Sequence, residues 1–172
     1  ADERHQGRIL VISATNRPDR LDAALKRTGR TSVRVPFLLP DHAMRAALFP
    51  LFVRRDQFAT SVTDFAQFAT ETDGYSGADI REIVRVADAF AHGAGKDAIE
   101  AEAFRAATAD FIPHAEAAAY ARMTLRAIAE CSSRRLLPLN IEDIIRRAHA
   151  AATGTQRVTS AIGDVLAAVP VD

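Results

Sequence analysis

The stretch from Ile9 to Arg30, ILVISATNRPDRLDAALKRTGR, decides how the rest of the chain is interpreted. It opens with the apolar run Ile9–Ile12, whose branched side chains are typical of a strand buried on both faces. A turn around Pro18 follows, because proline biases Arg17 away from the helical region. We therefore expect Asn16 just past the carboxyl end of a parallel strand, which is where open α/β sheets bind their ligands.

A short helix is expected after this turn. Asp22 is a good N-cap residue, and Gly29 suits the position after the last helical residue. Arg27 and Arg30 would then leave the end of that helix, where the helix dipole favours cations. Taken alone, Asn16 also fits ordinary turn chemistry, and both arginines also fit a solvated surface.

Length and composition narrow the class of protein. The chain has 172 residues, which suits one medium domain or two small ones, and 48% of them are hydrophobic. Its 22 basic residues balance 22 acidic ones, which argues against a general polyanion-binding protein. The single cysteine, Cys131, excludes a disulfide within one chain and fits a cytoplasmic location. We find no apolar run long enough to cross a membrane.

A dense pattern of residues in the opening stretch carries a family resemblance. The pattern is Ala14-Thr15-Asn16-Arg17-Pro18-Asp19, then Leu21-Asp22, Ala24-Leu25, Arg27 and Gly29-Arg30. It resembles the second half of an AAA ATPase core of the classical clade, of bacterial type. The resemblance implies that Asn16 is the sensor-1 residue, which orients the water that attacks the γ-phosphate. It implies that Arg27 and Arg30 are paired arginine fingers that reach the nucleotide of a neighbouring subunit, since a planar guanidinium can stabilise transition-state charge on a phosphoryl group.

Residues 1–40 are accordingly expected to be the C-terminal portion of an α/β core. The segment from Val33 to Leu39 stands where the family has its last core strand. Pro36 removes a hydrogen-bond donor from it, so we expect an edge strand or a bulge there. Such partly paired strands expose an apolar edge, which favours self-pairing.

Residues 41–112 resemble the small helical lid of the same family. We expect helices at about 42–54, 62–71, 77–92 and 99–110. Their expected apolar faces are Leu48, Leu51 and Phe52, then Phe65, Phe68 and Ala69, then Ile80, Ile83, Val84 and Ala87, with Ile99, Phe104 and Phe111 anchoring the last. Asp41 should cap the first helix, Pro50 should kink it, and Ser76 with Asp79 resembles a capping box.

Three lid residues are candidates for nucleotide binding. Phe52 aligns where many family members carry a histidine that approaches the adenine, although a core phenylalanine is the more common interpretation. The resemblance places Gly77 and Ala78 against the sugar and base edge of the nucleotide. Small residues at a helix N-terminus allow such close approach, and an ordinary helix start is the alternative.

Residues 113–172 form a C-terminal extension with no specific motif. We expect helices from Pro113 to about Ser132, at about 141–152 after the cap residue Asn140, and at about 158–169. The second should carry an apolar stripe formed by Ile141, Ile144, Ile145 and Ala148. These helices would complete the lid or, alternatively, form a module for subunit contact or partner docking.

Two motifs of a complete ATP site are absent from the sequence. None of the eight glycines begins a G-x-x-x-x-G-K-[ST] phosphate-binding loop, and no apolar strand ends in Asp-Glu. The family's chemistry needs that phosphate cradle together with Mg²⁺. We therefore expect no tight ATP or Mg²⁺ binding and no ATPase activity from these residues alone. The five histidines have no metal-ligand spacing, so no metal site is expected.

The sequence thus predicts an α/β fragment, the end of a P-loop AAA core sheet, followed by an all-α lid and mostly helical overall. The expected function is that of the C-terminal part of an ATPase that works as a homo-oligomeric ring, a hexamer by resemblance, using ATP and Mg²⁺ to remodel a protein substrate in the cytoplasm. A non-catalytic assembly or adaptor module is the alternative. DNA binding through Arg134-Arg135 and Arg146-Arg147 is disfavoured by the zero net charge, and no membrane partner is expected.

Overall fold

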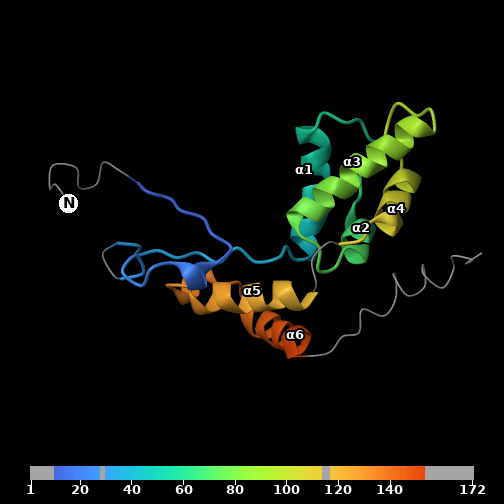
Figure 1. The fold of residues 1–172 in the computed structure, drawn as a ribbon. Helices are drawn as coiled ribbons and strands as arrows, with labels where there is room; N and C mark the ends of the chain where they lie inside the picture. Colours follow the sequence, from blue (N-terminus) through green and yellow to red (C-terminus); the bar gives the residue numbers. More distant parts are fainter. Residues whose placement is uncertain (1–9, 28–29, 114–116, 154–172) are drawn as a thin grey trace, which may run out of the picture.

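The computed structural model describes residues 10–27, 30–113 and 117–153. An N-terminal segment, residues 10–27 and 30–39, precedes two helical units (Figure 1). The first unit, here called the helical domain, contains α1 (His42–Arg55), α2 (Ala66–Glu71), α3 (Gly77–Gly93) and α4 (Ala101–Asp110). The second, the α5–α6 hairpin, contains α5 (Ala117–Ala129), the short 3₁₀ turn η3 (Arg134–Leu136) and α6 (Ile141–Thr153).

Four phenylalanines form the centre of the helical domain. They come from α1, from the residue preceding α2, from α2 and from α4, and their ring centroids lie 5.3–6.1 Å apart. These residues are Phe49, Phe65, Phe68 and Phe104. The core continues along one face of α3, where Ile80, Ile83, Val84 and Ala87 are completely buried, which confirms the predicted stripe. Aromatic pairs at these separations contribute beyond the apolar area that they bury.

The helix starts follow the predicted capping chemistry. The Asp41 carboxylate accepts a hydrogen bond from the backbone N–H of Met44 at 2.8 Å. At the start of α3, the Ser76 hydroxyl accepts from the N–H of Asp79, and the Asp79 carboxylate accepts from the N–H of Ser76 in return. Each cap satisfies a backbone donor that has no partner inside the helix.

The predicted apolar face of α1 is confirmed in part. Phe52 is buried and Leu48 packs half-buried against the core, but Leu51 is exposed. The other buried residues of this helix are Arg45, Phe49 and Val53. The buried positions 49, 52 and 53 have the same helical spacing as the predicted 48, 51 and 52, moved by one residue. Packing of Phe49 in the phenylalanine cluster decides which face of α1 is turned toward the core. Pro50 lies inside α1, which continues past it to Arg55.

Two loops of the helical domain are joined by a short β-bridge. Thr60 pairs with Ile99 in parallel orientation, and the Thr60 hydroxyl donates to the Ile99 carbonyl at 2.7 Å. The N–H of Ile99 donates to the Ala59 carbonyl at 2.8 Å. These bonds hold the loop between α1 and α2 against the loop before α4, and they let Ile99 enter the core without leaving its backbone groups unpaired.

The expected strands are not seen in the N-terminal segment. Leu10, Val11 and Ile12 have no regular secondary structure and are about four-fifths exposed, and Val33, Val35 and Phe37 are exposed as well. A buried parallel strand takes its hydrogen bonds from neighbouring strands, and none of the described residues supplies such a neighbour. The mostly helical character holds for the described part of the chain, whereas its α/β part is not seen there.

The short helix expected after Pro18 is also not formed. The 3₁₀ turn η2 (Pro18–Arg20) is followed by a single turn, in which the Asp22 carboxylate accepts from the N–H of Ala24 at 2.8 Å. The Asp22 carbonyl accepts from the N–H of Leu25 at 2.9 Å. The cap interaction therefore occurs, but only a single turn follows it among the described residues, and the first turn of a helix is costly to nucleate.

The α5–α6 hairpin forms as expected for its first two helices. Ala121 of α5 and Ala148 of α6 are buried, and the two helices pack against each other. Small residues let helices approach closely, which suits a two-helix contact. The third expected helix, at 158–169, and the residues before Leu10 lie outside the described residues. Among the helices that the structure describes, none has the length and apolar character to span a membrane.

Candidate functional site

Asn16 lies in an exposed turn whose shape is held by its immediate neighbours. The Thr15 hydroxyl accepts from the N–H of Arg17 at 3.0 Å, and the Arg17 guanidinium donates twice to the Asp19 carboxylate at 3.2 and 3.1 Å. This bidentate pair raises the pKa of Arg17 and lowers the pKa of Asp19. The Asn16 side chain is therefore presented to solvent on a locally defined turn.

Arg27 and Arg30 are both exposed. The N–H of Arg30 donates to the Arg27 carbonyl at 3.1 Å, and the Arg30 guanidinium reaches the Ala24 carbonyl at 3.5 Å. Ion pairs between described residues involve Arg17, Lys26 and Arg34 of this segment, but neither Arg27 nor Arg30. Both guanidiniums therefore have N–H groups that could donate hydrogen bonds to an external phosphate.

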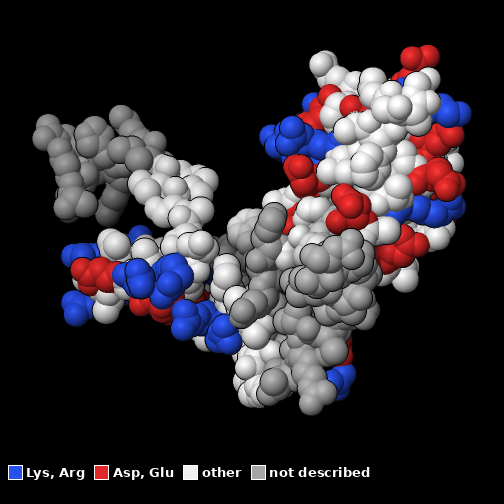
Figure 2. All heavy atoms as spheres, turned by 45° about the vertical axis from the view of Figure 1, so that its right-hand side comes forward, with Lys and Arg blue, Asp and Glu red and all other residues white. Residues whose placement is uncertain are grey.

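The N-terminal segment is basic although the whole chain is neutral. Its acidic residues are Asp19 and Asp22, and its basic residues are Arg17, Arg20, Lys26, Arg27, Arg30 and Arg34. Figure 2 shows several Lys and Arg side chains, with Asp and Glu side chains among them, on the left-hand part of the molecule, where this segment lies. Local positive potential of this kind attracts anionic ligands.

The segment that carries both arginines is held against the C-terminal end of α5. Lys26 pairs with Glu130 at 2.6 Å, and the Arg34 guanidinium donates to the Glu130 carbonyl at 2.8 Å. Arg34 and Ser132 also exchange two hydrogen bonds, N–H to hydroxyl at 3.0 Å and N–H to carbonyl at 3.2 Å. Sequence analysis missed these contacts, because they join residues about a hundred positions apart and no local pattern announces them.

Gly77 and Ala78 occupy the first two positions of α3. Gly77 is half-buried and Ala78 is exposed. A Cβ added at Gly77 would lie 3.8 Å from Cδ1 of Leu48, which is ordinary contact, so packing against the described neighbours does not require glycine here. The absence of a side chain leaves the backbone accessible from outside the domain.

The charge at this helix start suits a neutral group better than a phosphate. The Asp79 carboxylate sits in the first turn and accepts from the backbone and hydroxyl of Ser76 at 2.8 and 2.7 Å. Burial, and secondarily Asp79, raise the pKa of the neighbouring Tyr75 phenol. Because a carboxylate already offsets the positive end of the helix dipole, a sugar or base edge fits this place better than an anion.

Phe52 is part of the core. Its side chain is only 8% exposed, and it belongs to the same cluster as Phe49 and Phe68. Stacking on a base would require this ring to leave the core. The structure therefore favours the packing interpretation that sequence analysis set beside the nucleotide one.

The candidate residues fall into two groups. Asn16, Arg27 and Arg30 belong to the N-terminal segment, whereas Gly77 and Ala78 begin α3 in the helical domain (Figure 1). No hydrogen bond or ion pair found among the described residues joins one group to the other. A site that used both would therefore draw on two separate surfaces.

Asp73 links three parts of the described chain. Arg45 of α1 is 5% exposed and pairs with Asp73 at 3.1 Å, while it donates to the carbonyls of Ala69 at 2.9 Å and Pro40 at 2.8 Å. Arg147 of α6 pairs with the same carboxylate at 2.6 Å. Asp73 thereby joins the helical domain to the hairpin just before the start of α3.

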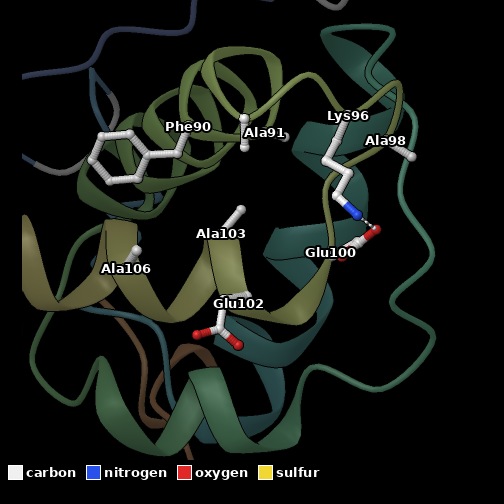
Figure 3. A pocket seen from close by; sticks show the side chains of 9 residues that line it. Phe90, Ala91, Lys96, Ala98, Glu100, Glu102, Ala103 and Ala106 are labelled. Carbon is white, nitrogen blue, oxygen red and sulfur yellow. Dashed lines mark ion pairs between the residues drawn. The ribbon is translucent and has the colours of Figure 1, made fainter.

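A shallow hollow lies at the opposite end of α3, between that helix and α4 (Figure 3). It has a volume of about 240 Å³ and is lined mostly by alanines, with Phe90 on one side. The rim carries Glu102 and the Lys96–Glu100 ion pair, whose atoms lie 3.2 Å apart. This hollow contains none of the predicted site residues. Among the residues described here, no cluster of His, Cys, Asp and Glu could hold a metal ion.

A comparison with known protein families finds a match within the helical domain. Residues 63–106, which span α2, α3 and the start of α4, match the AAA+ lid domain family. Over residues 63–106 the chain therefore resembles AAA+ lid domains, and its likeness to AAA ATPases is shown for the region that contains this match.

Three relatives illustrate the likeness. The chain is 41% identical over 85 residues to the ATP-dependent zinc metalloprotease FtsH of Marinobacter nauticus, which covers 49% of this chain and 13% of that protein. It is 44% identical over 77 residues to vacuolar protein sorting-associated protein 4B of Pongo abelii, covering 45% and 17%. It is 36% identical over 104 residues to the proteasome-activating nucleotidase of Methanocella arvoryzae, covering 60% and 25%. The chain thus spans a quarter or less of these relatives.

Proposed function

We propose that these residues are the C-terminal part of an AAA ATPase that hydrolyses ATP at the subunit interfaces of a ring and uses the energy to remodel protein substrates. The observation that carries the proposal is the pair of exposed guanidiniums, Arg27 and Arg30, on a basic segment that also presents Asn16. The lid domain and the names of the relatives, which include an ATP-dependent protease and a nucleotidase, support the general activity.

The proposed division of labour follows the chemistry of phosphoryl transfer. ATP and Mg²⁺ would be held by other parts of the whole protein, and the metal would supply charge neutralisation for the phosphates. Asn16 orients the attacking water in its own subunit. Arg27 and Arg30 act on the neighbour's nucleotide, where two planar guanidiniums stabilise the charge that develops on the transferring group. Gly77 and Ala78 contact the sugar and base edge of the nucleotide.

The chain's own copies are the proposed partners, arranged as a hexameric ring in the cytoplasm. An arginine finger acts on a different subunit from its own, so a monomer would leave Arg27 and Arg30 without a nucleotide to act on. A closed ring gives each site one such neighbour. The single cysteine suits a reducing compartment.

The first test substitutes the fingers in the full-length protein. Arg27→Ala should abolish ATP turnover while leaving ATP binding intact, because the guanidinium contributes in the transition state of the neighbouring site. The matched control is Arg20→Ala, an exposed arginine in η2 of the same segment. Turnover by Arg27→Ala at the wild-type rate would refute the finger assignment.

A subunit-mixing experiment tests the cis and trans roles separately. Asn16→Ala and Arg27→Ala subunits should each be inactive alone. In mixed rings, an Arg27→Ala subunit keeps its own Asn16 and receives fingers from an Asn16→Ala neighbour. ATPase activity should therefore return on mixing, and its absence with intact rings would show that the two residues do not serve opposite sides of one interface.

A non-catalytic assembly module is the second candidate. It is favoured by the exposed apolar residues of the N-terminal segment, Val33, Val35 and Phe37, which offer a contact surface irrespective of catalysis. ATPase assays of the full-length protein distinguish the two candidates. An assembly module would hydrolyse no Mg-ATP, with or without a substitution of Arg27 or Arg30. We expect the 172 residues alone to bind Mg-ATP no tighter than about millimolar in titration calorimetry.

A further inference from the structure

We propose that Glu130, at the C-terminal end of α5, is a positioning residue for Arg27 and Arg30. It holds Lys26 and Arg34, which stand on either side of the two arginines in the sequence, and so ties the finger segment (residues 17–27 and 30–34) to the α5–α6 hairpin. The inference rests on the proposed function of Arg27 and Arg30. It gives the C-terminal hairpin, which the sequence left without a specific role, a task in the active site.

The Glu130 contacts are short and partly shielded from water. Its carboxylate pairs with Lys26 Nζ at 2.6 Å and lies 3.9 Å from Arg34 Nε, while its backbone carbonyl accepts from Arg34 Nε at 2.8 Å. The three side chains are between 23% and 31% exposed. Charge-assisted hydrogen bonds in such partly buried places are stronger than exposed surface pairs.

Arg34 closes the base of the loop that carries the fingers. Its guanidinium donates to the carbonyls of Lys26 at 3.2 Å and Thr31 at 3.3 Å. Its backbone exchanges hydrogen bonds with Ser132, which follows Glu130 in the chain. Lys26 and Arg34 are thereby fixed to each other and to the same end of α5.

A second contact ties the Asn16 turn to the same helix. Arg126, one turn before the end of α5, pairs with Asp19 at 3.3 Å, and Asp19 also holds Arg17. Both proposed catalytic parts of the N-terminal segment are therefore attached to one rigid helix, as the closeness of η2 and α5 shows in Figure 1. An irregular segment without such anchors would lose the precise geometry that transition-state contacts need.

The expected consequence is a loss of turnover without a loss of nucleotide affinity. In the full-length protein, Glu130→Ala should lower kcat by about 10- to 100-fold, because misplacing a catalytic group by about 1 Å costs on the order of 100-fold. The KM for ATP should change less than about twofold, since fingers act on the transition state of a neighbouring site. Hydrogen exchange should speed up in the finger segment. The matched control is Glu142→Ala on the exposed first turn of α6.

A double-mutant cycle separates positioning from general damage. Lys26→Met removes the other half of the pair and lies in an irregular segment, so it leaves the helices intact. If both residues act through one contact, Lys26→Met with Glu130→Ala should lower kcat no further than the more severe single variant. Strictly additive losses would overturn the inference. Should Glu130→Ala lose helix content, Lys26→Met provides the kcat, KM and exchange test by itself.

The outcomes distinguish this inference from the proposed function. Wild-type turnover by Arg27→Ala would refute the finger assignment, and the positioning role of Glu130 would be refuted with it. If Arg27→Ala is inactive while Glu130→Ala turns over at the wild-type rate with unchanged hydrogen exchange, the finger assignment is kept and the positioning role of Glu130 is refuted.

Discussion

Replacing Arg45 with methionine should destabilise the helical domain by about 2–4 kcal/mol. Arg45 is 5% exposed and donates to the Ala69 and Pro40 carbonyls at 2.9 and 2.8 Å, besides pairing with Asp73. Methionine keeps the aliphatic length of the side chain, so the core packing changes little. The variant therefore isolates the loss of the guanidinium donors.

The magnitude follows from what each partner loses. An unsatisfied buried acceptor costs about 1–3 kcal/mol, and two carbonyls lose a charged donor here. Ala69 keeps only a long contact from the Thr72 hydroxyl at 3.5 Å. The ion pair adds little, because the Asp73 side chain is 54% exposed and water can replace its partner. Asp73→Asn should accordingly cost less than about 1 kcal/mol.

The assay is urea denaturation of the chain followed by far-UV circular dichroism. Arg54→Met, an exposed position on the same helix, is the matched control and should shift the midpoint little. Similar slopes of the unfolding free energy against urea concentration would show that the variants expose the same amount of surface on unfolding. The reasoning fails if Asp73→Asn loses as much stability as Arg45→Met, since the ion pair rather than the backbone acceptors would then dominate.

Three further outcomes are expected. Gly77→Ala should leave the midpoint of urea unfolding unchanged or raise it, because the added methyl only touches Leu48. In the full-length protein the same substitution should weaken nucleotide binding. A lower midpoint would show that the glycine is needed for packing. Phe104→Ala should cost about 3–5 kcal/mol in the same assay because it opens the centre of the phenylalanine cluster, and a cost near 1 kcal/mol would contradict that packing. Arg81 lowers the pKa of Asp56, so this pair stabilises the fold above the unfolded carboxyl pKa of about 3.9 and ceases to do so as pH falls through the lower folded value. The stability difference between wild type and Asp56→Asn should thus narrow in thermal melts below about pH 4, and a constant difference from neutral to acidic pH would exclude the linkage.

The helices of this protein could be predicted from local sequence because their signals are local. Asp41 and the Ser76–Asp79 capping box mark two starts, and the spacing of Ile80, Ile83 and Val84 marks the buried face of α3; the structure agrees with each. A side chain three or four positions along a helix must lie on the same face, so periodicity alone carries this information.

The opening stretch shows where local sequence fails. Leu10, Val11 and Ile12 have the composition of a buried strand, yet they are exposed in the structure. A strand exists only with its hydrogen-bonded neighbours, and composition cannot supply them. The face of α1 that is turned toward the core was not fully predicted for a related reason. Two neighbouring faces of this helix are apolar, and packing around Phe49 in the phenylalanine cluster decides between them.

Sequence by itself determined the lid helices, their caps, and the candidate chemistry of Asn16, Arg27 and Arg30, whose roles stay predictions. Only the tertiary structure decided the long-range contacts. It buries Phe52 in the core, pairs both Arg45 and Arg147 with Asp73, and places Glu130 beside Lys26 and Arg34. These contacts join distant residues whose spacing obeys no helical or strand period. Arg45 and Glu130 need such partners because folding removes these charged groups from much of their contact with water, and the local chain does not provide a partner for either.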